Sequence, residues 1–295
     1  MHHFKGLNRF LAGLVACGVC VGLLAGSASA LGFTSAAIPN VTAPSVTVDT
    51  ENAPQAADRL VSTVHYSASY SSTVIGCLED GTEVTVLGTS GSFYKIDCFE
   101  MKGYISKTQV TQEADGKYYV TSDPTSSEAK YLPAVTQEQV LTLRETVRAE
   151  ALSMQGVRYV SGGYSRRGID CSGLTRWVYS AAGYSIRYTA TPQMSDGVIV
   201  SQDNLQCGDL IFFKNTTNAG TLATHVGIYL GNGKLIHAGD HGVSVVELSN
   251  RYFQNHYLCA RRIILSSPAL RTMLPNLATS QDINSSYWRS SSQAQ

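Results

Sequence analysis

Asp170-Cys171-Ser172-Gly173-Leu174 is followed, 54 positions after its cysteine, by His225-Val226-Gly227-Ile228-Tyr229 and then by Ile236-His237-Ala238. A thiol becomes a useful nucleophile when an adjacent imidazole takes its proton and a third polar group fixes the tautomer of that imidazole. One cysteine and two histidines supply this minimum. We therefore predict Cys171 as nucleophile, His225 as general base and His237 as the group that orients His225.

The residues around the cysteine predict a helix that begins at the nucleophile. Asp170 is a favourable N-cap, and Cys171, Leu174, Val178 and Ala182 then recur on one apolar helical face. Cys171 should therefore open a buried helix. Because the positive end of the helix dipole stabilises a thiolate, we expect a lowered pKa for Cys171.

The two histidines fall on two apolar runs that predict an antiparallel hairpin around Gly231-Asn232-Gly233. A three-residue loop would pair Leu230 with Lys234 and make His225 and His237 diagonal neighbours on one face. A turn formed by only the last two loop residues would put the histidines on opposite faces. The chemistry therefore favours the longer loop, with its last glycine in a bulge.

Length and charge limit the function classes. A chain of 295 residues with 43% hydrophobic content can bury one catalytic core and a smaller module. The 22 basic and 22 acidic side chains balance, and without residues 1–30, which hold two basic and no acidic residues, 20 basic face 22 acidic ones. This balance argues against nucleic acid as a partner.

The N-terminus predicts a signal peptide over residues 1–30. Lys5 and Arg9 precede the apolar run Leu11 to Leu24, and Ala28-Ser29-Ala30 has the small-residue pattern of a cleavage site. A retained membrane anchor is the alternative, but the run is short of the roughly 20 residues that a spanning helix needs. A lipoprotein-type site at Cys17 would cut inside the apolar run and ranks lower. We expect a secreted or cell-wall-associated protein.

Five cysteines remain once Cys17 and Cys20 leave with the signal. In an oxidising compartment an odd count is most simply two disulfides and one free thiol. If Cys171 stays reduced, the pairs are Cys77 with Cys98 and Cys207 with Cys259. Free buried cysteines remain an alternative. A zinc site is disfavoured, because no Cys-x-x-Cys pair remains after residue 30.

Composition divides the rest of the chain. Residues 31–57 and 113–135 are predicted to be linkers, although Tyr118-Tyr119-Val120 is a candidate strand, and 267–295 a disordered polar tail. Thr136-Gln137-Glu138-Gln139 has a capping-box pattern and predicts a helix that ends before Gly156. Short β-type runs fill residues 58–112: Val61–Val64, Thr73–Leu78, Glu83–Leu87, Phe93–Ile96 and Lys102–Ile105.

Four segments between about Thr136 and Ile264 resemble the NlpC-type bacterial cell-wall cysteine peptidases: residues 156–163, 170–174, 205–213 and 225–238. The resemblance implies an α+β, papain-like catalytic domain over 136–266, with helices packed on an antiparallel sheet. It gives Cys171, His225 and His237 the roles stated above. It also places Tyr159, Asp170 and Ser172 where family members contact the substrate. Ser161 and Cys207 depart from the usual aromatic residue and proline, and neither is in the triad.

Residues 58–112 resemble a bacterial SH3-like barrel, a small all-β module, through Glu79–Val86 and Gly103–Ser106. Such modules are often attached to these peptidases. The resemblance implies wall binding or framing of the substrate groove, and a stabilising or spacing role is an equal alternative.

Taken with the resemblance, the sequence predicts a monomeric cysteine endopeptidase without cofactor or metal. Its expected substrate is the peptidoglycan stem peptide, cut between γ-D-glutamate and the third-position diamino acid. An amidase or acyltransferase that uses the same acyl-enzyme is one alternative. A wall-binding protein with a vestigial catalytic domain is another.

Overall fold

The computed structural model describes residues 58–99 and 101–267, which lie within one compact unit. The predicted signal peptide at 1–30, the linker at 31–57 and all but the first residue of the tail at 267–295 lie outside the described residues. The first half contains β1 (Arg59–His65), β2 (Val74–Glu79), β3 (Glu83–Ser90), β4 (Phe93–Cys98), β5 (Met101–Ser106), η1 (Lys107–Gln109), β6 (Val110–Gln112), β7 (Tyr118–Val120), β8 (Ala129–Leu132) and β9 (Ala134–Val135).

The second half contains α1 (Gln137–Ser153), β10 (Tyr164–Ser165), β11 (Gly168–Ile169), α2 (Cys171–Ala181), α3 (Ala190–Gln193), β12 (Val198–Val200), η2 (Gln202–Asn204), β13 (Leu210–Phe213), β14 (His225–Gly231), β15 (Lys234–Gly239), β16 (Gly242–Glu247), α4 (Arg251–His256), β17 (Tyr257–Arg262) and β18 (Leu265–Ser266). No helix of the described residues is long and apolar enough to cross a membrane.

Strands β1 to β8, within residues 59–132, form an antiparallel β unit, and β9 pairs in parallel with β18 in a separate two-stranded sheet. Each of the five β-type runs read from the sequence is a strand, β1 to β5, and the candidate strand at Tyr118–Val120 is β7. The segment 113–135, which the sequence assigned to a linker, is paired into the sheet: β7 lies against β3 and β6, and β8 pairs with β1.

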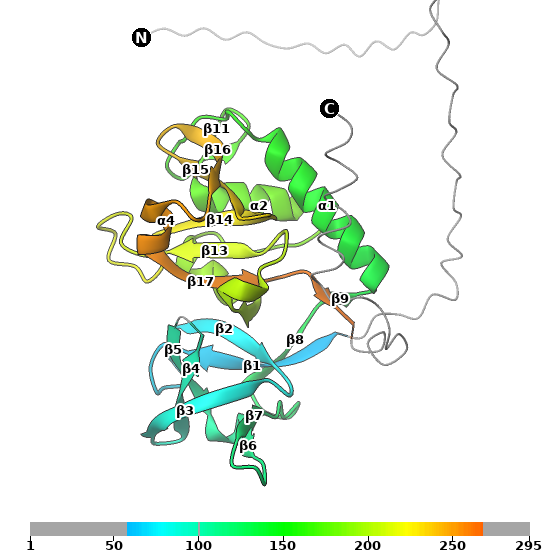
Figure 1. The fold of residues 1–295 in the computed structure, drawn as a ribbon, viewed down its shortest axis with the longest axis vertical. Coiled ribbons are helices and arrows are strands. Elements are labelled where there is room, and N and C mark those ends of the chain that lie inside the picture. The colour runs from blue at the N-terminus through cyan, green and yellow to red at the C-terminus, as the bar shows by residue number, and fades with distance from the viewer. Residues whose placement is uncertain (1–57, 100, 268–295) are drawn as a thin grey trace, which may run out of the picture. The chain divides into compact units, whose positions relative to one another are not determined.

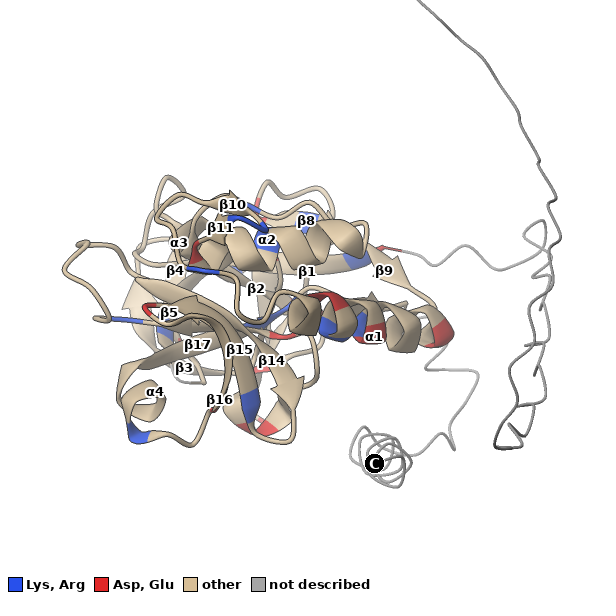
Figure 2. Cartoon of the chain, turned by 90° about the horizontal axis from the view of Figure 1, so that it is seen from above, with Lys and Arg blue, Asp and Glu red and all other residues tan. Residues whose placement is uncertain are grey.

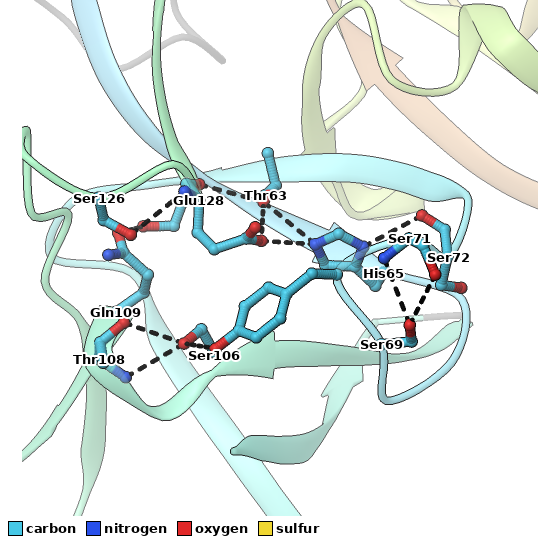
Figure 3. Close-up of polar contacts among 12 residues, drawn as sticks. Thr63, His65, Ser69, Ser71, Ser72, Ser106, Thr108, Gln109, Ser126 and Glu128 are labelled. Atoms are coloured by element: carbon cyan, nitrogen blue, oxygen red, sulfur yellow. Dashed lines mark hydrogen bonds and ion pairs between the residues drawn. The ribbon is translucent and has the colours of Figure 1, made fainter. Parts of the chain in front are cut away.

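A buried polar network ties β8 to β1 (Figure 3). His65 on β1 and Glu128, just before β8, are 2% and 6% exposed. His65 Nε2 lies 2.5 Å from Glu128 Oε2, and the hydroxyl of Thr63 donates to the same carboxylate oxygen at 2.7 Å. Since a buried carboxylate is stable only with partners, this network fixes the segment before β8.

The second half contains a sheet of six strands in the order β16-β15-β14-β13-β17-β12, with every neighbouring pair antiparallel. Helices α1 and α2 contact each other, and α2 packs on β14 and β15 (Figure 1). Helix α1 begins with the predicted capping box of Thr136 and Gln139. Figure 2 shows acidic and basic residues interspersed along α1, as expected for an amphipathic helix with one face in solvent. This architecture agrees with the predicted helices on an antiparallel sheet.

Arg261 on β17 joins the two halves. It is fully buried, and its Nε donates to the carbonyls of Ile75 on β2 and Met194 after α3, each at 3.0 Å. Ile75 sits where the pairing of β1 with β2 shifts register, so its carbonyl is free to accept. Val198 on β12 also pairs with Cys77 on β2, which continues one sheet into the other.

The predicted disulfides are wrong, because no disulfide links any of the five described cysteines. Two strands, β1 and β5, lie between β2 with Cys77 and β4 with Cys98, and the two side chains enter different apolar clusters. A disulfide needs Cα atoms within about 7 Å. Cys207 points at the carbonyl of Arg144 on α1, whereas Cys259 is packed in the core on β17. Topology therefore keeps both predicted pairs apart.

Candidate active site

The nucleophile candidate stands at the first residue of α2. Asp170 caps this helix: its Oδ1 accepts from the amide of Gly173 at 2.6 Å and from the hydroxyl of Ser172 at 3.0 Å. Its Oδ2 accepts from the amide of Gly162 at 2.9 Å, which ties the preceding loop to the helix start. The predicted cap is confirmed, and it fixes the half-buried Cys171 against a rigid helix end.

In the hairpin of β14 and β15 the two histidines lie on the same face of the sheet, as predicted, but the turn differs from the predicted one. Gly227 pairs with His237 as required, but Lys234 pairs with Gly231, not with Leu230. The turn is the two-residue Asn232-Gly233, both with positive φ (49° and 74°), as a type I′ turn requires. A register shift between Tyr229 and Gly231 restores the facing. The predicted three-residue loop is therefore wrong, and the bulge lies on β14.

Gly227 gives the two histidine strands their close approach. A Cβ at this position would lie 2.8 Å from the carbonyl oxygen of Ile236 and 3.1 Å from the Cβ of His237. The first distance is shorter than side chains tolerate. A larger residue at 227 would push His237 away from its partner.

The two candidate histidines are in direct contact. His225 Nε2 lies 3.0 Å from His237 Nδ1, and the rings are nearly perpendicular, at 82°. If His225 Nε2 carries a hydrogen and donates it to His237 Nδ1, then His225 Nδ1 is left as the proton acceptor. The pair thus has the geometry of a base and its orienting group.

Two aromatic residues that the sequence analysis did not single out hold these rings. The Phe253 ring lies 5.1 Å from that of His237 at 72°, and the Phe213 ring lies 5.9 Å from that of His225. Both phenylalanines are buried. Aromatic packing of this kind restricts ring rotation. Their sequence signal, apolar residues in β13 and α4, does not differ from that of ordinary core residues.

The side chains of Cys171, His225 and His237 are uncharged near neutral pH. Burial, followed by the nearby Asp170 carboxylate, raises the pKa of Cys171 to about 11, although backbone amides, that of Val226 foremost, lower it. Burial lowers the pKa of His225 to about 3, with His237 adding to the effect, and burial lowers the pKa of His237 to about 4. The expected low thiol pKa is therefore wrong, because burial outweighs the helix dipole. Cys171 is a thiol near neutral pH and needs a base to become nucleophilic.

The depressed histidine pKa values predict acid sensitivity of the fold. Above pH 6.5 both rings are neutral in the folded and unfolded states. Between pH 6.5 and about 3 an unfolded His225 takes up a proton while the folded one does not. Because the unfolded state then binds more protons, the free energy of unfolding decreases as the pH is lowered. We expect the urea midpoint to drop between pH 7 and pH 4.5. A His225→Asn, His237→Asn double variant with an unchanged pH slope would contradict this cause.

The three residues predicted to contact the substrate differ in how accessible their side chains are. Tyr159 forms a β-bridge with Ile169, just before the helix cap, and the residue is 39% exposed. Burial raises the pKa of Tyr159, and the Asp170 carboxylate acts in the same direction. Ser172 is buried and donates to Asp170. The tyrosine is thus open to a ligand, whereas the serine hydroxyl serves the carboxylate.

Known proteins share the segments that build this site. The model of the NlpC/P60 family matches residues 156–262. The bifunctional muramidase/DL-endopeptidase CwlT of Bacillus subtilis is 38% identical over 120 residues, 40% of this chain and 36% of that protein. The γ-D-glutamyl-L-lysine dipeptidyl-peptidase of Bacillus cereus is 36% identical over 111 residues, 37% of this chain and 33% of that one.

A solved structure of an NLP/P60 family protein from Staphylococcus aureus, described as similar to a lipoprotein, is 36% identical, with a TM-score of 0.40. It covers 51% of this chain and 52% of its own. The present chain spans about a third of the length of the two curated relatives named above. Residues 156–262, about a third of the chain, match the NlpC/P60 family and form an NlpC/P60 domain.

Proposed function

We propose that this chain is a cysteine endopeptidase of peptidoglycan. The observation that carries the proposal is the contact of 3.0 Å between the rings of His225 and His237. The residue after His225 on the same strand is Val226, and its backbone amide faces the sulfur of Cys171. The strand that carries His225 therefore lies beside the helix start that carries Cys171, as a nucleophile, its base and an orienting group would require. The NlpC/P60 domain and the names of the two curated relatives support the same class of reaction.

In the proposed mechanism His225 takes the proton of the Cys171 thiol as the sulfur attacks the scissile carbonyl. The imidazolium then gives this proton to the leaving amine, and an acyl-enzyme remains. Water, deprotonated by the same ring, releases the acid and regenerates the thiol. His237 holds His225 in the required tautomer throughout. The amides at the start of α2, that of Cys171 among them, are placed to stabilise the oxyanion.

The proposed bond lies between γ-D-glutamate and the third residue of the stem peptide. The name of the Bacillus cereus relative specifies a γ-D-glutamyl-L-lysine bond, and that of the Bacillus subtilis relative a DL-endopeptidase. Asp170 supplies negative charge beside the thiol, although its oxygens already accept three hydrogen bonds. A free α-ammonium of L-alanine would pair with this carboxylate, since a charge-assisted contact is among the stronger polar interactions.

We expect mass spectrometry to find a free stem peptide cut after D-glutamate. Acetylation of its alanine removes the positive charge and should lower kcat/KM by about 10- to 100-fold, the equivalent of one hydrogen bond to a charged group. A stem peptide with an unmodified amine and an amidated C-terminus is the matched control. Equal rates on free and acetylated peptides, or cleavage at the amide between sugar and alanine, would contradict this specificity without touching the Cys171 chemistry.

The finer parts of the proposal concern location and the β unit. We place the protein outside the cell, on the signal-peptide pattern of residues 1–30. We assign residues 58–112 to an SH3-like module that contacts the wall or frames the groove. Support comes from the sequence resemblance and from the antiparallel pairing of β1 to β5.

A further inference from the structure

The short helix α3 contacts both elements that carry the candidate catalytic residues. Its four residues, Ala190–Gln193, are labelled near α2 in Figure 2. Two of its side chains make hydrogen bonds to neighbouring elements. One reaches the first turn of α2, which begins with Cys171, and the other reaches the chain that enters β14, which begins with His225.

Gln193 contacts the first turn of the nucleophile helix. Its side chain is fully buried, and its Oε1 accepts from the hydroxyl of Thr175 at 2.8 Å. Its Nε2 donates to the carbonyl of Ser172, the residue after the nucleophile, at 3.2 Å and to that of Arg187 at 2.8 Å. Both amide hydrogens and the amide oxygen therefore have partners, and these fix the orientation of the amide.

Thr191 contacts the entry to the histidine strand. Its Oγ1 accepts from the amide of Ala223 at 2.9 Å and lies 3.2 Å from the carbonyl of the same residue, to which it donates. Ala223 is two residues before His225 and is buried. A contact with both the N–H and the C=O of one residue fixes where the strand begins more sharply than apolar packing does.

Helix α3 is itself held on both sides. Arg187, before the helix, forms an ion pair with Asp196, after it. The carbonyl of Met194, at the helix end, accepts from Arg261 at 3.0 Å. The helix is therefore a fixed reference against which two separate elements are placed.

We infer that Thr191 and Gln193 are positioning residues, which hold α2 with Cys171 and β14 with His225 at a fixed position relative to each other. The inference rests on the proposed function, because it concerns the attack of Cys171 assisted by His225. Misplacement of a catalytic group by about 1 Å can lower a rate about 100-fold. Two hydrogen-bonded anchors on one helix are a direct way to avoid that error.

Thr191→Val tests the strand anchor, because valine keeps the shape and loses the hydroxyl. We expect kcat to fall about tenfold or more with little change in KM. Thr191→Ser restores the hydroxyl and should return kcat to within about threefold of the unmodified chain. Gln193→Met keeps the length of the side chain without its hydrogen bonds and tests the helix anchor in the same way.

Alkylation of Cys171 by iodoacetamide gives a readout that needs no peptidoglycan. Near pH 7 the thiol depends on His225 for removal of its proton, whereas at high pH it ionises alone. The Thr191→Val variant should therefore react more slowly near pH 7, as His225→Ala does, and converge on the unmodified protein as the pH approaches 11. A loss of stability alone would not change the shape of this profile.

Thr63→Val is the matched control. Thr63 is a buried threonine whose hydroxyl contacts the carbonyl and carboxylate of Glu128 in the β unit (Figure 3). It should lose at least as much stability as Thr191→Val and keep the unmodified alkylation profile. A Thr191→Val protein with the unmodified profile, or a Thr63→Val protein that changes equally, would overturn the inference. If neither the unmodified chain nor any variant cuts a stem peptide, the proposed function is contradicted. The alkylation profiles still test the positioning role of Thr191 in that case.

Discussion

Cys171→Ala and His225→Ala are expected to lower kcat/KM for stem-peptide hydrolysis by about 10⁴-fold or more, the loss that follows removal of a nucleophile or its base from a triad. The sulfur forms the acyl-enzyme, and alanine offers no substitute. The His225 ring, neutral because burial lowers its pKa to about 3, is the proton acceptor in the proposed mechanism. His237→Ala should cause a loss roughly 10 to 100 times smaller, because an orienting group does not itself carry the proton.

Cys207→Ala is the matched control for the nucleophile. Burial raises the pKa of the Cys207 thiol to about 12, and its sulfur faces the Arg144 carbonyl on α1. Its removal should leave kcat/KM unchanged. Circular dichroism and the urea midpoint establish that each variant is folded. Unmodified turnover by a folded Cys171→Ala protein would overturn the mechanism.

Arg261→Met is expected to cause a large loss of stability. The arginine satisfies the carbonyl of Ile75, released by the register shift in β2, and the carbonyl of Met194 at the end of α3. Methionine fills much of the same volume but donates no hydrogen bond. Two or more buried acceptors would then lack partners at about 1–3 kcal/mol each, so the unfolding free energy should fall by about 3 kcal/mol or more. Urea denaturation measures this change directly.

Arg251→Met provides the comparison, because it removes the same charge from an exposed position at the start of α4. Surface changes of this kind alter stability by about 0.5 kcal/mol or less. If Arg261→Met lowered the unfolding free energy by no more than Arg251→Met does, the hydrogen bonds of Arg261 would not be what holds β17 to β2.

Local signals predicted most of the fold around the site. The cap at Asp170, the capping box at Thr136 and the pairing of Gly227 with His237 follow from residue type and spacing within about a dozen positions. Each depends on short-range backbone geometry that a sequence pattern carries directly. The three residues proposed for the triad come from these same local patterns.

Quantities that depend on distant packing were not predictable. The cysteine pairs failed because the sequence gives no strand order, and the thiol pKa failed because burial of Cys171 depends on β14. Arg261 and Gln193 lie in ordinary strand and loop patterns, and their partners are up to 186 positions away. Only the folded chain shows that these side chains connect separate elements.

The bulge in β14 decides whether the rings of the two histidines lie on the same face of the sheet, because side chains alternate between faces along a strand. His225 and His237 are 12 positions apart, and a flush ladder closed by the Asn232-Gly233 turn would send their rings to opposite sides of the sheet. The one extra residue at the bulge reverses that outcome. A single deletion or insertion within the paired residues of β14 or β15 would therefore turn one ring to the other face of the sheet while leaving a hairpin. Within the paired residues of the two strands, the rings keep their common face only when the length changes by an even number of residues.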